Sequence, residues 1–190
     1  MDRSRLIKGI EDSARAIQSL GGQAAELEAV CEALIRALKA GNKVLTAGNG
    51  GSASEAMHMT EELIGRFRGN RRPLPAVCLA ADGTALTCIA NDFGYDEVFS
   101  RQVEGLGKAG DVLVLFSTSG RSANLVKALD AASRAGVKTI CLLGKGGGDM
   151  KGRADYEIIV QSQATEHIQE AHQVMMHLML DAVELAFGPV

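Results

Sequence analysis

The sequence has no tryptophan, only three prolines and no long uninterrupted apolar run. A membrane-spanning helix needs about 20 consecutive apolar residues, and a secretory leader has an apolar centre, whereas residues 1–8 are rich in charge. We therefore expect neither membrane insertion nor secretion. With 190 residues, of which 46% are apolar, the composition favours one compact domain, residues 1–190, with a sizeable core.

The chain also lacks a large charge of either sign, since 20 basic and 23 acidic residues give a formal net charge of -3. We expect no nucleic-acid partner, because such binding needs a basic surface. An anionic ligand must instead be held by a few local groups. The cysteines form no Cys-x-x-Cys pair and lie mostly in apolar runs, which is typical of reduced, buried thiols and predicts a cytoplasmic protein; they are Cys31, Cys78, Cys88 and Cys141.

Short runs rich in valine, isoleucine and leucine alternate with helical patterns. Five runs predict strands buried on both faces, as in a parallel sheet, at residues 43–47, 76–80, 111–116, 138–143 and 156–160. Helical spacing is found at residues 2–20, 24–40, 53–67, 122–135 and 164–186. This order predicts a three-layer α/β/α sandwich with a five-stranded parallel sheet, preceded by a helical segment, residues 1–40. The basic stretch 66–75 is expected to be a solvated loop.

Two loops rich in glycine and serine follow the first and third predicted strands, where ligands bind in open α/β sheets. The first, Gly48 to Ser52, leads directly into a helix, so its backbone can approach an anion closely at the helix start. The second, Ser117 to Ser122, adds hydroxyl donors that bring no charge. Turns and helix caps would explain either loop alone. Together the loops predict a phosphate-binding site.

Two glycine patterns, one of them in the first of these loops, point more weakly to nucleotide binding. Gly48, Gly50 and Ala53 satisfy the Gly-x-Gly-x-x-Ala pattern of dinucleotide-binding proteins, but no acidic residue ends a strand about 20 residues further on. The run 144–148 resembles a P-loop, yet Lys145 is not followed by serine or threonine. We interpret this run as a flexible turn.

His58 and Glu62 are four residues apart on the helix after the first loop, so they share one face and lie about 6 Å apart along the axis. This spacing suits a shared metal ion, although ordinary surface pairs have it too. Three of the four histidines are on the last predicted helix.

That last helix carries two stripes. The apolar stripe should pack on the sheet or a neighbouring helix; it consists of Ile168, Ala171, Met175, Leu178, Ala182 and Leu185. Gln169, Gln173 and His177 lie on the opposite side, and we expect them to face solvent or another subunit. Gln169 and His177 are about 12 Å apart along the axis, which is far for one metal ion with bonds of about 2 Å. We therefore predict a site shared between copies of the chain.

Six motifs spread over nearly the whole chain are Gly48-Asn49-Gly50-Gly51-Ser52, Ala56-Met57-His58, Glu61-Glu62-Leu63, Asn91-Asp92-Phe93-Gly94, Ser117-Thr118-Ser119-Gly120 and Gln169-Glu170-Ala171-His172. Together they resemble the phosphoheptose isomerase family, whose members are sugar-isomerase (SIS) domains. The resemblance implies a flavodoxin-like fold and a homotetramer with intersubunit active sites. It also implies conversion of sedoheptulose 7-phosphate into D-glycero-D-manno-heptose 7-phosphate, which leads to ADP-heptose for lipopolysaccharide.

Carried over by position, the resemblance implies a site as well. One zinc ion per subunit would be held by His58, Glu62, Gln169 and His177, and Glu62 and His177 would be the catalytic acid/base pair. Substrate contacts would be Asn49, Gly50, Gly51, Ser52, Glu62, Asn91, Asp92, Ser117, Thr118, Ser119, Ser122 and Gln169. Where family members commonly have Asp-Arg-Ile-Gln, this chain has residues 166–169 as Glu-His-Ile-Gln, so one arginine is missing. His167 and His172 are alternative ligands or proton carriers, but we favour positions at the surface or beside the site for both.

These residue types suit aldose-ketose isomerisation. A carboxylate such as Glu62 moves a proton between C1 and C2 through an enediol, a histidine such as His177 exchanges protons with the oxygens, and zinc polarises those oxygens. A hydride shift is the alternative chemistry. The rival function is a non-catalytic SIS scaffold, similar to the DnaA-associating replication factor, which need not keep the four proposed metal ligands together.

Overall fold

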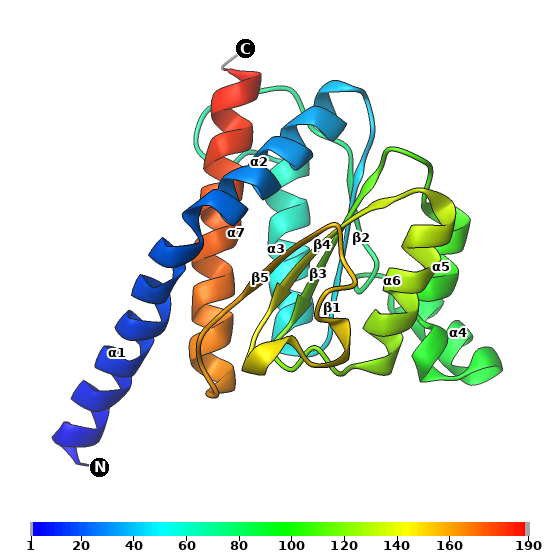
Figure 1. The fold of residues 1–190 in the computed structure, drawn as a ribbon. Coiled ribbons are helices and arrows are strands. Elements are labelled where there is room, and N and C mark those ends of the chain that lie inside the picture. The colour runs from blue at the N-terminus through cyan, green and yellow to red at the C-terminus, as the bar shows by residue number, and fades with distance from the viewer. Residues whose placement is uncertain (1, 189–190) are drawn as a thin grey trace.

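The computed structural model describes residues 2–188 and has the predicted three-layer α/β/α architecture (Figure 1). Its five parallel strands form one sheet in the order β2-β1-β3-β4-β5, the flavodoxin-like order. The strands are β1 (Val44–Gly48), β2 (Ala76–Cys78), β3 (Val112–Ser117), β4 (Lys138–Leu143) and β5 (Tyr156–Ile159). The predicted strands were therefore confirmed, with small shifts at their ends.

Helices cover both faces of the sheet. One layer contains α2 (Ala24–Lys39), α3 (Gly51–Ile64) and α7 (Thr165–Phe187), with α1 (Arg3–Gln18) beside α7. The other layer contains α4 (Gly83–Phe93), α5 (Ser100–Leu106) and α6 (Ala123–Ala135). Short 3-10 helices are η1 (Ser19–Gln23), η2 (Tyr95–Glu97) and η3 (Lys145–Met150). Within residues 2–188, no helix has the length and apolar character needed to cross a bilayer.

The core divides into two clusters because successive side chains of a strand point to opposite faces of the sheet. On β3, Val112, Val114 and Phe116 are buried in the cluster that includes α2, α3 and α7. Leu113 and Leu115 are buried in the cluster that includes α5 and α6. All six β3 residues are buried, which explains why the strand is apolar up to its last residue, Ser117.

The strand order brings the two glycine- and serine-rich loops together. β1 pairs with both β2 and β3, and its last residue, Gly48, lies opposite Phe116 near the end of β3. The loops that follow β1 and β3 therefore begin side by side at the same edge of the sheet. This is the topological switch point at which ligands bind in open α/β sheets.

The buried face of α7 differs from the predicted apolar stripe. Ile168, Ala171 and Met175 are buried as expected, but Leu178 and Leu185 are 48% and 80% exposed. Positions beside the predicted stripe are buried instead, among them His172, Met176, Met179, Leu180 and Val183. The physical reason is that α7 packs against three helices, α1, α2 and α3, so no single stripe describes its contacts.

The basic segment 66–75 is irregular, as expected, but it is not simply solvated. Arg71 is buried, and its guanidinium donates to the carbonyl oxygens of Glu62 and Leu63 at 2.6 and 2.9 Å. Those carbonyls are in the last turn of α3, where helices leave acceptors unpaired and where positive charge is favoured. Arg71 thus caps the helix that carries His58 and Glu62.

The glycine run 144–148 is a packed turn rather than a flexible one. It forms most of η3, and Met150 N–H donates to the Gly120 carbonyl at 3.1 Å. Gly120 and Gly147 approach so closely that a Cβ on Gly120 would collide with the Gly147 carbonyl. The run therefore supports the loop after β3 from behind.

We expect Gly120→Ala to lower the free energy of unfolding by about 2–4 kcal/mol, because a φ of +62° and the backbone collision act together. Gly146→Ala is the matched control. It has a similar φ of +79° with nothing within 4 Å of the added Cβ, so it should cost only about 1–2 kcal/mol. Urea unfolding measures both, and equal losses would contradict the supporting role of η3.

Candidate functional site

The two glycine- and serine-rich loops line one cavity of about 230 Å³ at the switch point. Eight of the predicted substrate residues line it: Asn49, Gly51, Ser52, Ser117, Thr118, Ser119, Ser122 and Gln169. Helices α3 and α6 both begin at these loops, so their positive ends favour an anion there. We call this cavity the cradle.

Two hydroxyl oxygens of the cradle already accept a hydrogen bond from the backbone. The Ser117 hydroxyl oxygen accepts from Gly120 N–H at 3.0 Å, and the Ser119 oxygen accepts from Arg121 N–H at 3.2 Å. Each hydroxyl hydrogen is then available to an anion. Gly50, directly before α3, has a φ of +58°, which glycine adopts without strain.

A network of polar side chains that was not predicted fixes Asn49. The amides of Asn49 and Asn124 exchange two hydrogen bonds of 2.9 Å, and the Tyr95 hydroxyl donates to Asn49 Oδ1 at 3.0 Å. Asn124 is buried in the first turn of α6. In the sequence, the only sign of this network was a polar residue, Asn124, near the start of the predicted helix 122–135.

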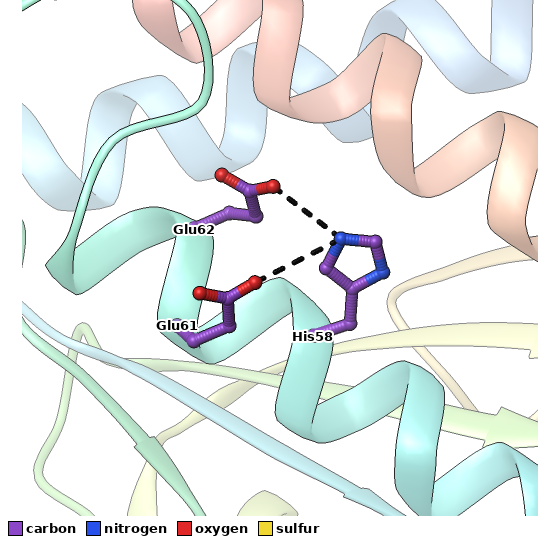
Figure 2. Close-up of side chains that lie close together, drawn as sticks. All are labelled: His58, Glu61 and Glu62. Carbon is purple, nitrogen blue, oxygen red and sulfur yellow. Dashed lines mark hydrogen bonds and ion pairs between the residues drawn. The ribbon is translucent and has the colours of Figure 1, made fainter.

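A second group of polar side chains lies on α3 (Figure 2). His58 and Glu62 are together, as predicted, with 3.3 Å between His58 Nε2 and Glu62 Oε1. Glu61 approaches the same nitrogen at 3.9 Å. The Glu62 side chain is 17% exposed and that of Glu61 is 69% exposed. These three residues form a group that could hold a metal ion, and the sequence did not single out Glu61 as a ligand.

Helix α7 completes this group from the same chain. The His177 ring lies edge-on to His58 with centroids 5.4 Å apart, and it stacks on Phe67 at 5.8 Å. The side-chain amide of Gln173 contacts His58 Nδ1. The polar stripe of α7 therefore faces α3 of its own chain, and the expectation that it faces away was wrong because α3 offers polar partners there.

Gln169 is separated from the other predicted ligands. Its amide lies against Gly51, where an added Cβ would collide with it, so Gln169 belongs to the wall of the cradle. The predicted separation of about 12 Å between Gln169 and His177 along the helix fits this arrangement. The structure thus gathers His58, Glu62 and His177 within one chain.

The electrostatics of His177 favour its neutral form. Burial lowers the pKa of His177, the neighbouring His58 lowers it further, and the opposing effect of Glu62 is smaller. A neutral imidazole can accept a proton or bind a metal. Imidazole nitrogens and a carboxylate are the donors that divalent transition metals bind in proteins, so the residues present fit a metal ion.

The remaining histidines lie apart from this group. His172 is buried, not at the surface: its Nε2 donates to the Leu143 carbonyl at 3.2 Å, and its Nδ1 faces Glu55 Oε2 at 3.7 Å. Neither of these facing atoms has another partner among residues 2–188. His167 is half-buried and contacts Glu170 at 3.0 Å.

Asn91 and Asp92 are exposed at the end of α4, where the Asn91 amide donates to Asp92 at 2.8 Å. They do not line the cradle.

Comparison with known proteins places this geometry in a family. The SIS domain model matches residues 10–144. The phosphoheptose isomerase of Akkermansia muciniphila is 46% identical over 178 residues, which are 94% of this chain and 93% of that protein. The chain belongs to the phosphoheptose isomerase family. Another member, from Helicobacter pylori strain Shi470, is 50% identical over 155 residues, which are 82% of this chain and 81% of that protein.

Solved structures of the phosphoheptose isomerase family have the same fold. GmhA from Neisseria gonorrhoeae aligns with a TM-score of 0.89 and 38% identity over 95% of this chain and 97% of that one. The enzyme from Francisella tularensis aligns with a TM-score of 0.92 and 31% identity over 96% and 97%. The sugar isomerase domain of an RpiR transcription factor from Sphaerobacter thermophilus, at 18% identity and a TM-score of 0.67, shares the fold alone; it covers 95% of this chain and 90% of that one.

We expect metal binding to distinguish the adjacent glutamates. Glu62→Gln removes the less exposed carboxylate, which lies 3.3 Å from His58. It should weaken Zn²⁺ binding by more than about 100-fold, because loss of a residue that only supports a ligand already weakens metal binding by about 10- to 100-fold. Glu61→Gln should weaken it by less than about fivefold, because exposed charges contribute at most about 1 kcal/mol. Equilibrium dialysis measures both, and similar losses would show that the two carboxylates are equivalent.

Proposed function

We propose that this chain is an aldose-ketose isomerase that converts sedoheptulose 7-phosphate into D-glycero-D-manno-heptose 7-phosphate, the entry to ADP-heptose and lipopolysaccharide. One observation carries the proposal: the first turns of α3 and α7 line part of the cradle of neutral donors, and the same two helices carry His58, Glu62 and His177. The phosphate of this substrate and its reacting carbons, C1 and C2, are at opposite ends of the sugar. Ser52 and His58 are about 9 Å apart along α3, so one extended ligand can reach both groups.

In this proposal the side chains of α3 and α7 carry out proton transfer. Glu62 is the base that removes a proton from one of the two reacting carbons and returns it to the other through an enediol. His177, whose surroundings lower its pKa and so favour the neutral form, exchanges protons with the sugar oxygens. The low exposure of Glu62 supports its role, because water competes less for its carboxylate.

We propose zinc, one ion per subunit, as the metal, with the four ligands that the family resemblance implies. His58, Glu62 and His177 of one chain would hold it, and Gln169, about 12 Å from His177 along α7, would come from a second copy of the chain. When bound, zinc supplies a Lewis acid that polarises the oxygens on C1 and C2. The nitrogen and oxygen donors around His58 support this choice.

The substrate phosphate would lie in the cradle against five hydroxyl groups, those of Ser52, Ser117, Thr118, Ser119 and Ser122. We also keep Asn91 and Asp92 as proposed substrate contacts. Tyr95 follows them closely and donates to Asn49, so the end of α4 adjoins the cradle.

We further propose a homotetramer with active sites between subunits. Helix α1 extends away from the sheet (Figure 1), and its Leu6 and Ile10 are 53% and 71% exposed. Clustered exposed apolar side chains mark interaction surfaces. Because α1 packs on α7, a partner bound to α1 would lie near the helix that carries Gln169 and His177.

The same proposal treats residues 1–190 as one domain in the cytoplasm. All four cysteines are unpaired, and burial raises the pKa of Cys141 to about 12, which leaves an unreactive thiol.

We expect turnover of sedoheptulose 7-phosphate, a loss of activity with a chelator, and recovery with Zn²⁺. Glu62→Gln and His177→Ala should each lower kcat by about 10²–10⁴-fold, as expected for loss of a general acid or base. The product formed in D₂O should carry deuterium at the carbon that receives the proton. Full activity of both variants would refute the roles assigned to Glu62 and His177. A wild type that does not turn over the substrate would favour the non-catalytic scaffold, and product without deuterium would favour a hydride shift.

The Leu6→Glu, Ile10→Glu double variant should dissociate into smaller species in light scattering, because each charge would be buried at the proposed interface. Glu11→Gln, at an exposed polar position of α1, is the control and should keep the wild-type mass. A wild-type monomer with full activity would refute the shared site.

A further inference from the structure

Gln173 touches the proposed metal group, although neither the sequence motifs nor the family resemblance gives it a role. It lies on α7, one turn before His177, and its side-chain amide contacts His58 Nδ1. On the other side of the same ring, Nε2 faces Glu62 at 3.3 Å. The two nitrogens of His58 are therefore assigned to different helices, with Nδ1 toward α7 and Nε2 toward the carboxylates of α3.

This division decides which nitrogen of His58 is free to bind a metal. A neutral imidazole carries one hydrogen, and a metal binds only the nitrogen that lacks it. If Nε2 is to bind the metal beside Glu62, Nδ1 must carry the hydrogen and donate it to an acceptor. Metal-binding histidines generally have such an acceptor, which fixes both the tautomer and the orientation of the ring.

The amide of Gln173 fits both states of His58. In the structure its NH₂ group faces Nδ1, so Gln173 donates to Nδ1 while Nε2–H donates to Glu62. An amide has an oxygen and a nitrogen at the same reach, and turning it over exchanges a donor for an acceptor. The same side chain can then accept the Nδ1 hydrogen when Nε2 loses its own.

We propose that Gln173 is a positioning residue that holds the hydrogen on His58 Nδ1 and so presents an unprotonated Nε2 to the metal. The proposal rests on the metal of the proposed function and is independent of which sugar phosphate reacts. It predicts that the acceptor at position 173, and not merely the bulk of the side chain, sets the affinity for the metal.

Zinc affinity, measured by competition with a chromogenic chelator, tests this directly. Gln173→Leu keeps most of the volume but removes the acceptor, and zinc binding should weaken by about 10- to 100-fold. Gln173→Glu offers an acceptor and should bind at least as tightly as wild type. Gln163→Leu changes an exposed glutamine just before α7 and should have no effect.

The ¹⁵N NMR signals of His58 give a readout that does not depend on activity. In zinc-loaded wild type and Gln173→Glu, the Nδ1 hydrogen should exchange slowly with water and give a visible signal. In Gln173→Leu, saturated with zinc, that hydrogen should exchange fast enough for the signal to vanish.

The outcomes separate this proposal from the proposed function. If Gln173→Leu binds zinc as tightly as wild type, or if both variants lose affinity equally, the positioning role is wrong, even in an active isomerase. If wild type binds no zinc, the role is wrong as well. If affinity falls in Gln173→Leu and returns in Gln173→Glu, the role stands even where sedoheptulose 7-phosphate is not turned over.

Discussion

The pairing of α3 with α7 is the constraint on which the site depends. Met59 and Leu63 of α3 are buried with Met175 and Met176 of α7 in the same core cluster, over one face of the sheet. Because this packing is apolar and tight, a shift of either helix by a fraction of a turn would open cavities and lower stability. This apolar packing therefore fixes the positions of the polar residues of α3 relative to those of α7.

Contacts across the pair advance in the same direction along both helices. Gly51 meets Gln169, Glu55 faces His172, and His58 meets Gln173 and His177. The two helices therefore run parallel at the site, and each successive turn performs a different task. The first turns wall the cradle, the middle turns bury an acid-histidine pair, and the later turns gather the groups that fit a metal. Gln169 and His177 lie at the two ends of this row of contacts, about 12 Å apart along α7.

Sequence patterns predicted the parts of the molecule that local chemistry determines. Strands buried on both faces are mostly apolar, so β3 and β4 were found almost to the residue. Helices α4 and α5 were missed because α4 has no fully buried residue and α5 has only seven residues, which leaves little periodicity to detect. The role of Arg71 depends on an irregular loop that folds back onto the end of α3, and that of Gln173 on a helix distant in sequence, so no local pattern encodes either role. Likewise, the helical spacing of residues in α7 identified its polar stripe but not the neighbouring helix that the stripe faces.

The uncharged lining of the cradle has a consequence for how a ligand is held. Among residues 2–188, no charged side chain lines this cavity, so a dianion there would be bound by short-range hydrogen bonds and helix ends rather than by a counter-ion. Dissolved salt weakens attraction between separated charges but has little effect on donors in direct contact with a desolvated oxygen. Ionic strength would therefore have little influence on the binding of such an anion, and discrimination among anions would follow from how many of their oxygens meet a hydroxyl.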